Sequence, residues 1–134
     1  MTHYPLLYGF NNLIAGNGFF AGVSLNGRAL LVDEGDGFWM YGVNPGGIAA
    51  GGATPGEAQS EFRLMYTSVL FDIAAEAGSF EEFKMRIDEF FSETNQPTAA
   101  EWNAAVEEVR RGHVDADWLD VDCVKRLLPQ LKLK

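Results

Sequence analysis

Two kinds of hydrophobic pattern follow one another along the chain and meet near residue 53. Between residues 18 and 52, short runs of aromatic and aliphatic residues alternate with glycine, asparagine and proline, which is typical of strands and turns. Beyond residue 53, apolar residues recur every three or four positions, the spacing of helices that bury one face. The pattern therefore predicts a sheet followed by helices.

The first half of the chain predicts an antiparallel β-meander. Asn26-Gly27 and Asp36-Gly37 suit type I′ hairpin turns, because both central positions of such a turn require a positive φ. The Asn44-Pro45 break precedes a short, glycine-rich run that suits an edge strand. The nearly continuous apolar character of Phe38 to Val43 indicates that both faces of that strand are covered. The four predicted strands are Phe19 to Leu25, Ala29 to Val32, Phe38 to Val43 and Gly47 to Gly51.

The glycine-rich segment that follows the predicted sheet has the residues of a helix start. Thr54 suits the N-cap, Pro55 suits the first helical position, and Glu57 stands where a capping box needs it. Gly52 belongs to the same structural corner. A phosphate-binding loop is the alternative, but the segment lacks the lysine or the G-x-G-x-x-G pattern of such loops, and Glu57 would repel an anion. We interpret the segment as a corner between sheet and helix.

The same capping signature recurs twice in the second half. Ser79 with Glu82 predicts the start of a second helix, and Thr98 with Glu101 predicts the start of a third, which Gly112 should end. In the first predicted helix the apolar positions form one stripe, which suits a helix lying across the sheet. The stripe comprises Ala58, Phe62, Met65, Tyr66, Val69, Leu70 and Ile73. The corresponding stripe of the second helix comprises Phe80, Phe83, Ile87 and Phe90.

The predicted fold class is α+β: an antiparallel β-meander of three to four strands with a long helix packed on one face, followed by two to three further helices. The last of these is a short helix near Asp120 to Leu128, ended by Pro129. A chain of 134 residues with 47% hydrophobic residues is the size of one domain. We expect a single domain over residues 1–134, with a sheet-plus-helix core at 18–78 and a helical extension at 79–134.

Charge narrows the choice of partner. The chain has 10 Lys and Arg against 19 Asp and Glu, a formal net charge of −9. Such a charge repels phosphate backbones, so direct nucleic-acid binding is doubtful and a basic protein partner is favoured. The single cysteine, Cys123, cannot form an internal disulfide, which fits a reducing cytoplasm. No apolar run reaches the roughly 18 residues that span a bilayer, and the first residues lack a secretion signal, so we expect a protein without a membrane segment.

Three acidic residues are the strongest candidates for chemistry. Asp33, Glu34 and Asp36 surround a predicted turn, where carboxylates could bind Mg²⁺ as in nucleases, although turns also hold solvated acidic residues. Neither His3 nor His113 has a Ser or Cys nearby that would form a nucleophile pair. The aspartates of residues 115–122 lack the glycine and glutamate of a calcium loop. We assign no catalytic residue, metal or cofactor.

The aromatic residues of the third predicted strand suggest a binding surface. Phe38, Trp39 and Tyr41 fall within four consecutive positions, and one face of a strand cannot hold all three. A core covered on both sides would explain them, and an interaction surface is the alternative. The predicted partner-binding residues are Phe38, Trp39, Tyr41, Asp33, Glu34 and Asp36.

The predicted sheet also has unguarded edges. Charged side chains usually protect an edge strand against pairing with another chain. The strand Phe19 to Leu25 and the strand around Ile48 carry none. The N-terminal segment is expected to cover one of these edges at most. We therefore expect a homodimer or larger closed oligomer. A lysine at Val23 or Ile48 should weaken this association more than it destabilises the fold.

The stretch from Ala29 to about Ala75 resembles the HicB-like antitoxins. It reads "ALLVDEGDGFWMYGVNPGG" followed by "GATPGEA", and the matching residues are Gly37, Phe38, Pro45, Gly47, Gly52, Thr54, Glu57 and Ala58. The resemblance implies a degenerate ribonuclease H-like fold and a partner that is a small basic ribonuclease toxin. It covers about a third of the chain.

The chain also departs from that family pattern. The "NPGGI" loop lacks the family's acidic residue and second proline, and the C-terminal segment, where many relatives bind DNA, is acidic. Operator binding is therefore in doubt. Two alternatives stay open: a ribonuclease H-like metal-dependent nuclease that uses Asp33, Glu34 or Asp36, and a stand-alone homo-oligomer with a regulatory or phage-related role.

Overall fold

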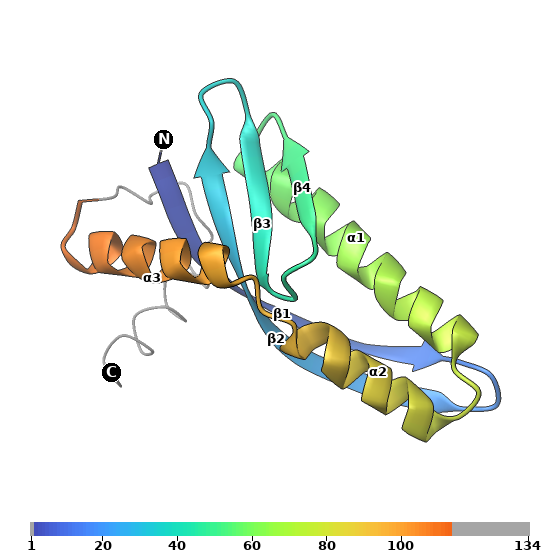
Figure 1. The fold of residues 1–134 in the computed structure, drawn as a ribbon. Coiled ribbons are helices and arrows are strands. Elements are labelled where there is room, and N and C mark those ends of the chain that lie inside the picture. The colour runs from blue at the N-terminus through green and yellow to red at the C-terminus, as the bar shows by residue number, and fades with distance from the viewer. Residues whose placement is uncertain (1, 114–134) are drawn as a thin grey trace.

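The computed structural model describes residues 2–113, which form one antiparallel sheet and three helices (Figure 1). The strands follow one another in the sheet in the order β1-β2-β3-β4, which confirms the meander. The predicted helix near Asp120 to Leu128 lies outside the described residues. The elements are β1 (Thr2–Ala15), β2 (Phe20–Asp33), β3 (Phe38–Asn44), β4 (Ala49–Gly52), α1 (Pro55–Glu76), α2 (Phe80–Ser92) and α3 (Gln96–Arg110).

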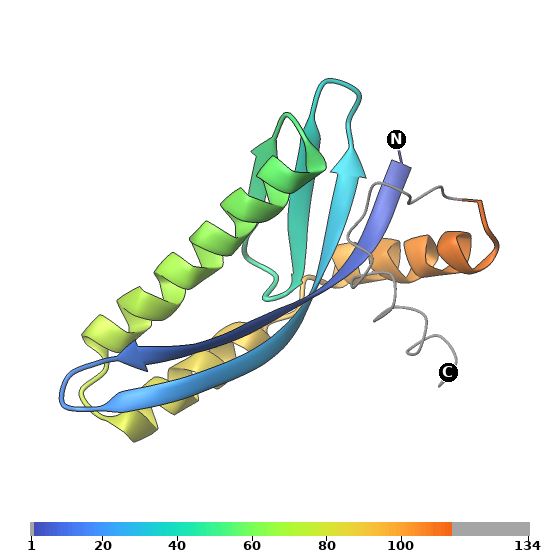
Figure 2. The same ribbon diagram turned by 180° about the vertical axis from the view of Figure 1, so that it is seen from behind.

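The first two strands form a hairpin that is much longer than the rest of the sheet. β1 and β2 pair from Thr2 opposite Asp33 to Ala15 opposite Phe20, whereas β3 pairs with β2 only between Arg28 and Asp33. We call residues 9–15 and 20–26 the arm, and the remainder of the sheet the base. Figure 2 shows the arm extending away from β3 and β4.

The sheet begins earlier than the sequence pattern indicated. β1 starts at Thr2 and covers one edge of β2 along its whole length, so the N-terminal segment is a full strand. β1 is in turn one edge strand of the sheet, and β4 is the other.

The predicted turn at Asn26-Gly27 is wrong, because both residues lie inside β2. Gly27 is opposite Tyr8, and a Cβ atom at position 27 would collide with the Tyr8 ring. The Tyr8 hydroxyl reaches past it to donate a hydrogen bond to the carbonyl oxygen of Asn44, at 2.9 Å. Gly27 therefore serves close packing within a strand, and its φ is not positive.

The turn predicted around Asp36-Gly37 does connect β2 to β3. The backbone N–H of Glu34 donates to the carbonyl oxygen of Gly37 at 2.9 Å. The positive φ, 90°, is at Gly35 instead of at the predicted dipeptide. The location of the turn is confirmed, and its type I′ geometry is not.

The corner between β4 and α1 is built as predicted. The Thr54 hydroxyl accepts a hydrogen bond from the Glu57 N–H at 3.1 Å, and the Glu57 carboxylate accepts one from the Ala53 N–H at 2.9 Å. Pro55 is the first helical residue, where no N–H is needed. A Cβ atom at Gly52 would lie 2.6 Å from the Glu57 Cβ, so only glycine lets the helix start this close to β4.

The second cap prediction is confirmed and the third is wrong. Ser79 caps α2 by accepting a hydrogen bond from the Glu82 N–H at 3.2 Å. α3 begins at Gln96, and its cap is Asn95, whose side-chain oxygen accepts a hydrogen bond from the Thr98 N–H at 3.2 Å. Thr98 is thus inside the helix, because Asn95 stands three residues ahead of it and is itself a good cap.

The sheet is covered on both faces, but only at its base. On one face, α1 and α2 pack on a main core to which both base and arm contribute; on the other, α3 packs on a second core against the base alone. Met40 belongs to the main core and Val43 to the second, which explains the continuous apolar character of β3. The second core comprises Leu30, Val32, Val43, Ala99, Trp102, Ala105 and Val106.

Two details of the sequence interpretation need correction. The helical spacing predicts that Met65 and Phe80 belong to buried stripes, but both are among the exposed large apolar residues. Val23 and Ile48 are only 6% and 5% exposed and belong to the main core. A lysine at either position would therefore damage the fold itself.

None of the three described helices combines the length and apolar character needed to cross a bilayer.

Candidate protein-interaction site

The three aromatic residues of β3 are divided between the two faces of the sheet. Phe38 packs against the main core, on the side of α1. Trp39 and Tyr41 point to the opposite face, where their rings stack with centroids 6.3 Å apart and an angle of 25° between planes. Trp39 is 43% exposed, and its indole lies over Gly51 of β4. Two of the three predicted aromatic residues, Trp39 and Tyr41, therefore lie on one face where a partner could contact them.

The acidic residues of the turn are also divided. The Glu34 carboxylate accepts a hydrogen bond from the Tyr41 hydroxyl at 2.8 Å, so it belongs to the aromatic pair. The Asp33 carboxylate accepts a hydrogen bond from the Gly35 N–H at 3.0 Å, which stabilises the turn. Asp36 is exposed. The structure therefore brings Glu34 together with Trp39 and Tyr41, and it leaves the two aspartates in the turn.

A further carboxylate reaches the site from α3. The pKa of Tyr41 is raised, first by burial, then by the hydrogen bond to Glu34, and also by the negative charges of Glu34 and Glu101. Tyr41 therefore stays protonated and keeps donating to Glu34 at neutral pH. Glu101 is also 3.7 Å from Nε2 of His3, at the start of β1.

The sequence interpretation missed the role of Glu101, which it placed in a capping box. Glu101 lies 60 residues beyond Tyr41 in the chain, and no local pattern connects the two positions. Only the packing of α3 across the base brings them together. We call the group formed by Trp39, Tyr41, Glu34 and Glu101 the aromatic–acidic patch.

The chemistry of the aromatic–acidic patch suits a cation. An ammonium or guanidinium group over the face of an exposed indole gains cation–π attraction, and adjacent carboxylates offer it charge-assisted hydrogen bonds. An arginine or lysine side chain carries the required apolar stem and charged end. The patch can therefore accept a basic side chain of another protein.

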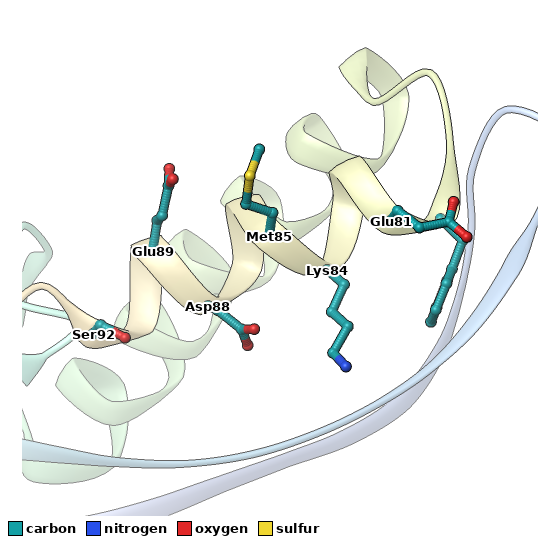
Figure 3. A pocket seen from close by; sticks show the side chains of 7 residues that line it. Glu81, Lys84, Met85, Asp88, Glu89 and Ser92 are labelled. Atoms are coloured by element: carbon teal, nitrogen blue, oxygen red, sulfur yellow. The ribbon is translucent and has the colours of Figure 1, made fainter.

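The two hollows described next are weaker candidates for a binding site than the aromatic–acidic patch. Figure 3 shows a depression on the exposed side of α2, where Lys84 and Asp88 point to one side and Met85 and Glu89 to the other. All residues that line it come from this one helix, so no second element closes it. Within residues 2–113, no group of three or more His, Cys, Asp or Glu residues is arranged to hold a metal ion.

A second hollow lies between the N-terminal half of α1 and the sheet. Its lining includes Tyr8, Met40, Arg63 and Tyr66. The Tyr66 hydroxyl is buried without a hydrogen-bond partner, and burial raises the pKa of that group. Because this oxygen is inaccessible to solvent, a molecule in the hollow could not reach it without displacing the rings packed around it, including that of Tyr8 at 5.2 Å.

Comparisons with protein-family models, curated proteins and solved structures gave no match to this chain. The resemblance to HicB-like antitoxins therefore rests on the residues between Ala29 and Ala75.

Proposed function

We propose that the protein is a non-catalytic protein-interaction module, similar to a HicB-like antitoxin, that binds and neutralises a small basic ribonuclease in a reducing cytoplasm. The observation that carries the proposal is the aromatic–acidic patch. It presents a half-exposed indole stacked on Tyr41, whose hydroxyl donates a hydrogen bond to the Glu34 carboxylate and whose pKa is raised in part by the charge of Glu101. An exposed aromatic ring together with acidic groups is a combination that recognises basic side chains.

The charge of the whole chain supports the same partner. A net charge of −9 attracts a basic protein over long distances and accelerates the encounter. The patch then supplies the short-range recognition, because aromatic residues at the centre of an interface contribute much of its affinity. The net negative charge thus acts at long range and the aromatic–acidic patch at contact, and both favour a basic partner.

The local contacts of the acidic residues favour this function over the nuclease alternative. A metal site needs carboxylate oxygens that are directed at one point. Here Glu34 accepts a hydrogen bond from Tyr41 and Asp33 accepts one from the Gly35 backbone, so each carboxylate already has a separate structural partner. Asp36 lies in the turn and is exposed.

The first test is genetic and biochemical. The reading frame next to this one should encode a short basic protein whose ribonuclease activity the present chain inhibits. Titration calorimetry of the purified pair should show that Trp39→Ala raises Kd by about tenfold or more. Glu34→Gln should weaken binding less and reduce its salt dependence, because it removes one charge and keeps an acceptor for Tyr41.

A matched control is Phe71→Ala, which removes a similarly exposed aromatic residue from α1 and should leave Kd unchanged. If Trp39→Ala and Phe71→Ala act alike, the aromatic–acidic patch is not the binding site. A Mg²⁺-dependent nuclease activity of the purified chain that Asp33→Ala or Asp36→Ala abolishes would overturn the whole proposal in favour of the enzyme.

A further inference from the structure

The two faces of the arm differ in burial at all positions except Gly9, Asn12 and Leu25. One face belongs to the main core and contributes Phe10, Ile14, Ala21 and Val23 to it. The opposite face, which we call the outer arm face, alternates with it along both strands and is exposed at every position except half-buried Gly9. Its residues are Gly9, Asn11, Leu13, Ala15, Phe20, Gly22, Ser24 and Asn26.

Two large apolar side chains stand on the outer arm face. Leu13 is 71% exposed and Phe20 is 80% exposed, the highest values among the exposed large hydrophobic residues that the structure describes. Leu13 is paired with Gly22 and Phe20 with Ala15, so the two side chains are diagonal neighbours across the hairpin. Together they form one apolar patch on a flat surface of small and amide residues.

No described helix covers this face. α3 lies on the same side of the sheet but contacts the base, where the Trp102 indole N–H donates to the Leu6 carbonyl oxygen at 3.3 Å and Glu101 approaches His3. Figures 1 and 2 show the arm continuing past α3, with α1 and α2 beside it. Among residues 2–113, nothing therefore covers the outer arm face, whereas the base of the same sheet is covered on both faces.

Charge indicates what occupies the outer arm face. Residues 4–27 contain no Asp, Glu, Lys or Arg, in a chain whose net charge is −9. A basic partner gains no electrostatic attraction from such a surface and is drawn to the acidic remainder. A second copy of this chain, in contrast, carries the same net charge of −9, and an uncharged face is where two copies can approach with least repulsion.

We propose that the outer arm face is the interface of a homodimer, in which two arms pack face to face about a two-fold axis. Such an interface is self-complementary, so Leu13 and Phe20 of one copy can fill the space that Gly9 and Gly22 leave on the other. This proposal is independent of the proposed function, because it uses a different surface and opposite electrostatics.

The size of the face sets the expected affinity. Seven residue pairs, from Gly9 opposite Asn26 to Ala15 opposite Phe20, give a length of about 23 Å, and two strands give a width of about 10 Å. This footprint of about 230 Å² per copy is well below that of a standard specific interface, so the contact is a weak, transient one. We therefore expect a dimer with a dissociation constant of about 0.1 to 1 mM.

The test is sedimentation equilibrium of the full chain at concentrations from about 10 μM to about 1 mM. Phe20→Lys and Leu13→Lys should each raise the dimer dissociation constant by about tenfold or more, because they place a charge within the apolar contact. Leu64→Lys is the matched control, since Leu64 is 62% exposed but lies on α1. All three changes bring the net charge from −9 to −8, so reduced repulsion cannot explain a difference between them.

Salt gives a second readout that separates this interface from the aromatic–acidic patch. Raising NaCl from about 50 to about 500 mM should leave the dimer unchanged or strengthen it, since screening relieves repulsion between two acidic chains. The same change should weaken binding of a basic partner. A chain that stays monomeric at about 1 mM, a dimer that Phe20→Lys leaves intact, an equal effect of Leu64→Lys, or a dimer that salt dissociates would each overturn the proposal.

Discussion

The base and the arm are made from the same two strands but are stabilised differently. In the base, side chains on both faces are buried, and Ala29 to Val32 form an unbroken apolar run. In the arm, burial alternates strictly along β2, with Ala21 and Val23 buried and their neighbours Gly22 and Ser24 exposed. The change in pattern occurs where β3 ends and the register of β2 shifts, between Arg28 and Ala29.

This difference shows that the environment of a strand can change halfway along it without a turn. A continuous apolar run marks a strand with two covered faces, and an alternating run marks a strand with one. The burial along β2 alternates from Phe20 onward because α1 and α2 cover one face of the arm and α3 does not reach the other.

The largest expected effect belongs to the covered base. Trp102→Ala should lower the free energy of unfolding by about 3 to 5 kcal/mol, because Trp102 is fully buried in the second core and leaves a large cavity. The change also removes the hydrogen bond to the Leu6 carbonyl and the contact with Arg28, whose Cζ lies 5.2 Å from the ring. Urea unfolding followed by circular dichroism measures the loss.

Trp39→Ala is the control on the same face of the sheet. Trp39 is nearly half exposed, so its removal should cost only about 1 kcal/mol. If the two tryptophan variants lose similar stability, α3 does not form a second core over the base.

Local signals in the sequence predicted those parts of the fold that local interactions determine. Thr54 and Ser79 cap their helices as expected, because a cap needs only residues within one turn. Asn26-Gly27 misled the strand assignment because its glycine makes room for the ring of Tyr8, 19 residues earlier in the chain. A short-range pattern contains no information on such a contact.

The same reasoning applies to the candidate site. Alternation along β3 required that Phe38 and Trp39 point to opposite faces, but the sequence could not show that α3 would cover its face of β3 only in part and leave Trp39 exposed. Glu34 lies seven residues before Tyr41 and reaches it across a tight turn, so that contact is a local one, although the sequence analysis did not predict it. Glu101 was missed because its place in the site depends on how a helix far along the chain packs on the sheet.

Two adjacent residues of the arm test the alternation directly. Val23→Lys should lower the free energy of unfolding by about 3 kcal/mol or more, because it places an unpaired charge in the main core. Ser24→Lys, one position later on the outer arm face, should change it by less than about 0.5 kcal/mol. Thermal unfolding at low protein concentration measures both without a contribution from dimerisation. Equal losses would mean that the arm is not covered on one face only.

The smallest of these effects concerns the point where α3 is attached to the base. Asn95→Ala should cost about 1 kcal/mol, because the side-chain oxygen of Asn95 accepts the hydrogen bond from the Thr98 N–H that begins the helix. Thr98→Ala should stay within about 0.5 kcal/mol of the parent chain, since Thr98 is inside the helix and alanine is the better helix former. Asn95→Asp should recover most of the loss, because aspartate is also a good cap and its charge suits a helix N-terminus.

Urea unfolding of the three variants, with Thr54→Ala at about 1 kcal/mol as the reference for a confirmed cap, ranks them. If Thr98→Ala proves as costly as Thr54→Ala while Asn95→Ala is neutral, α3 starts where the capping-box pattern placed it, and its attachment to the base differs from the one described.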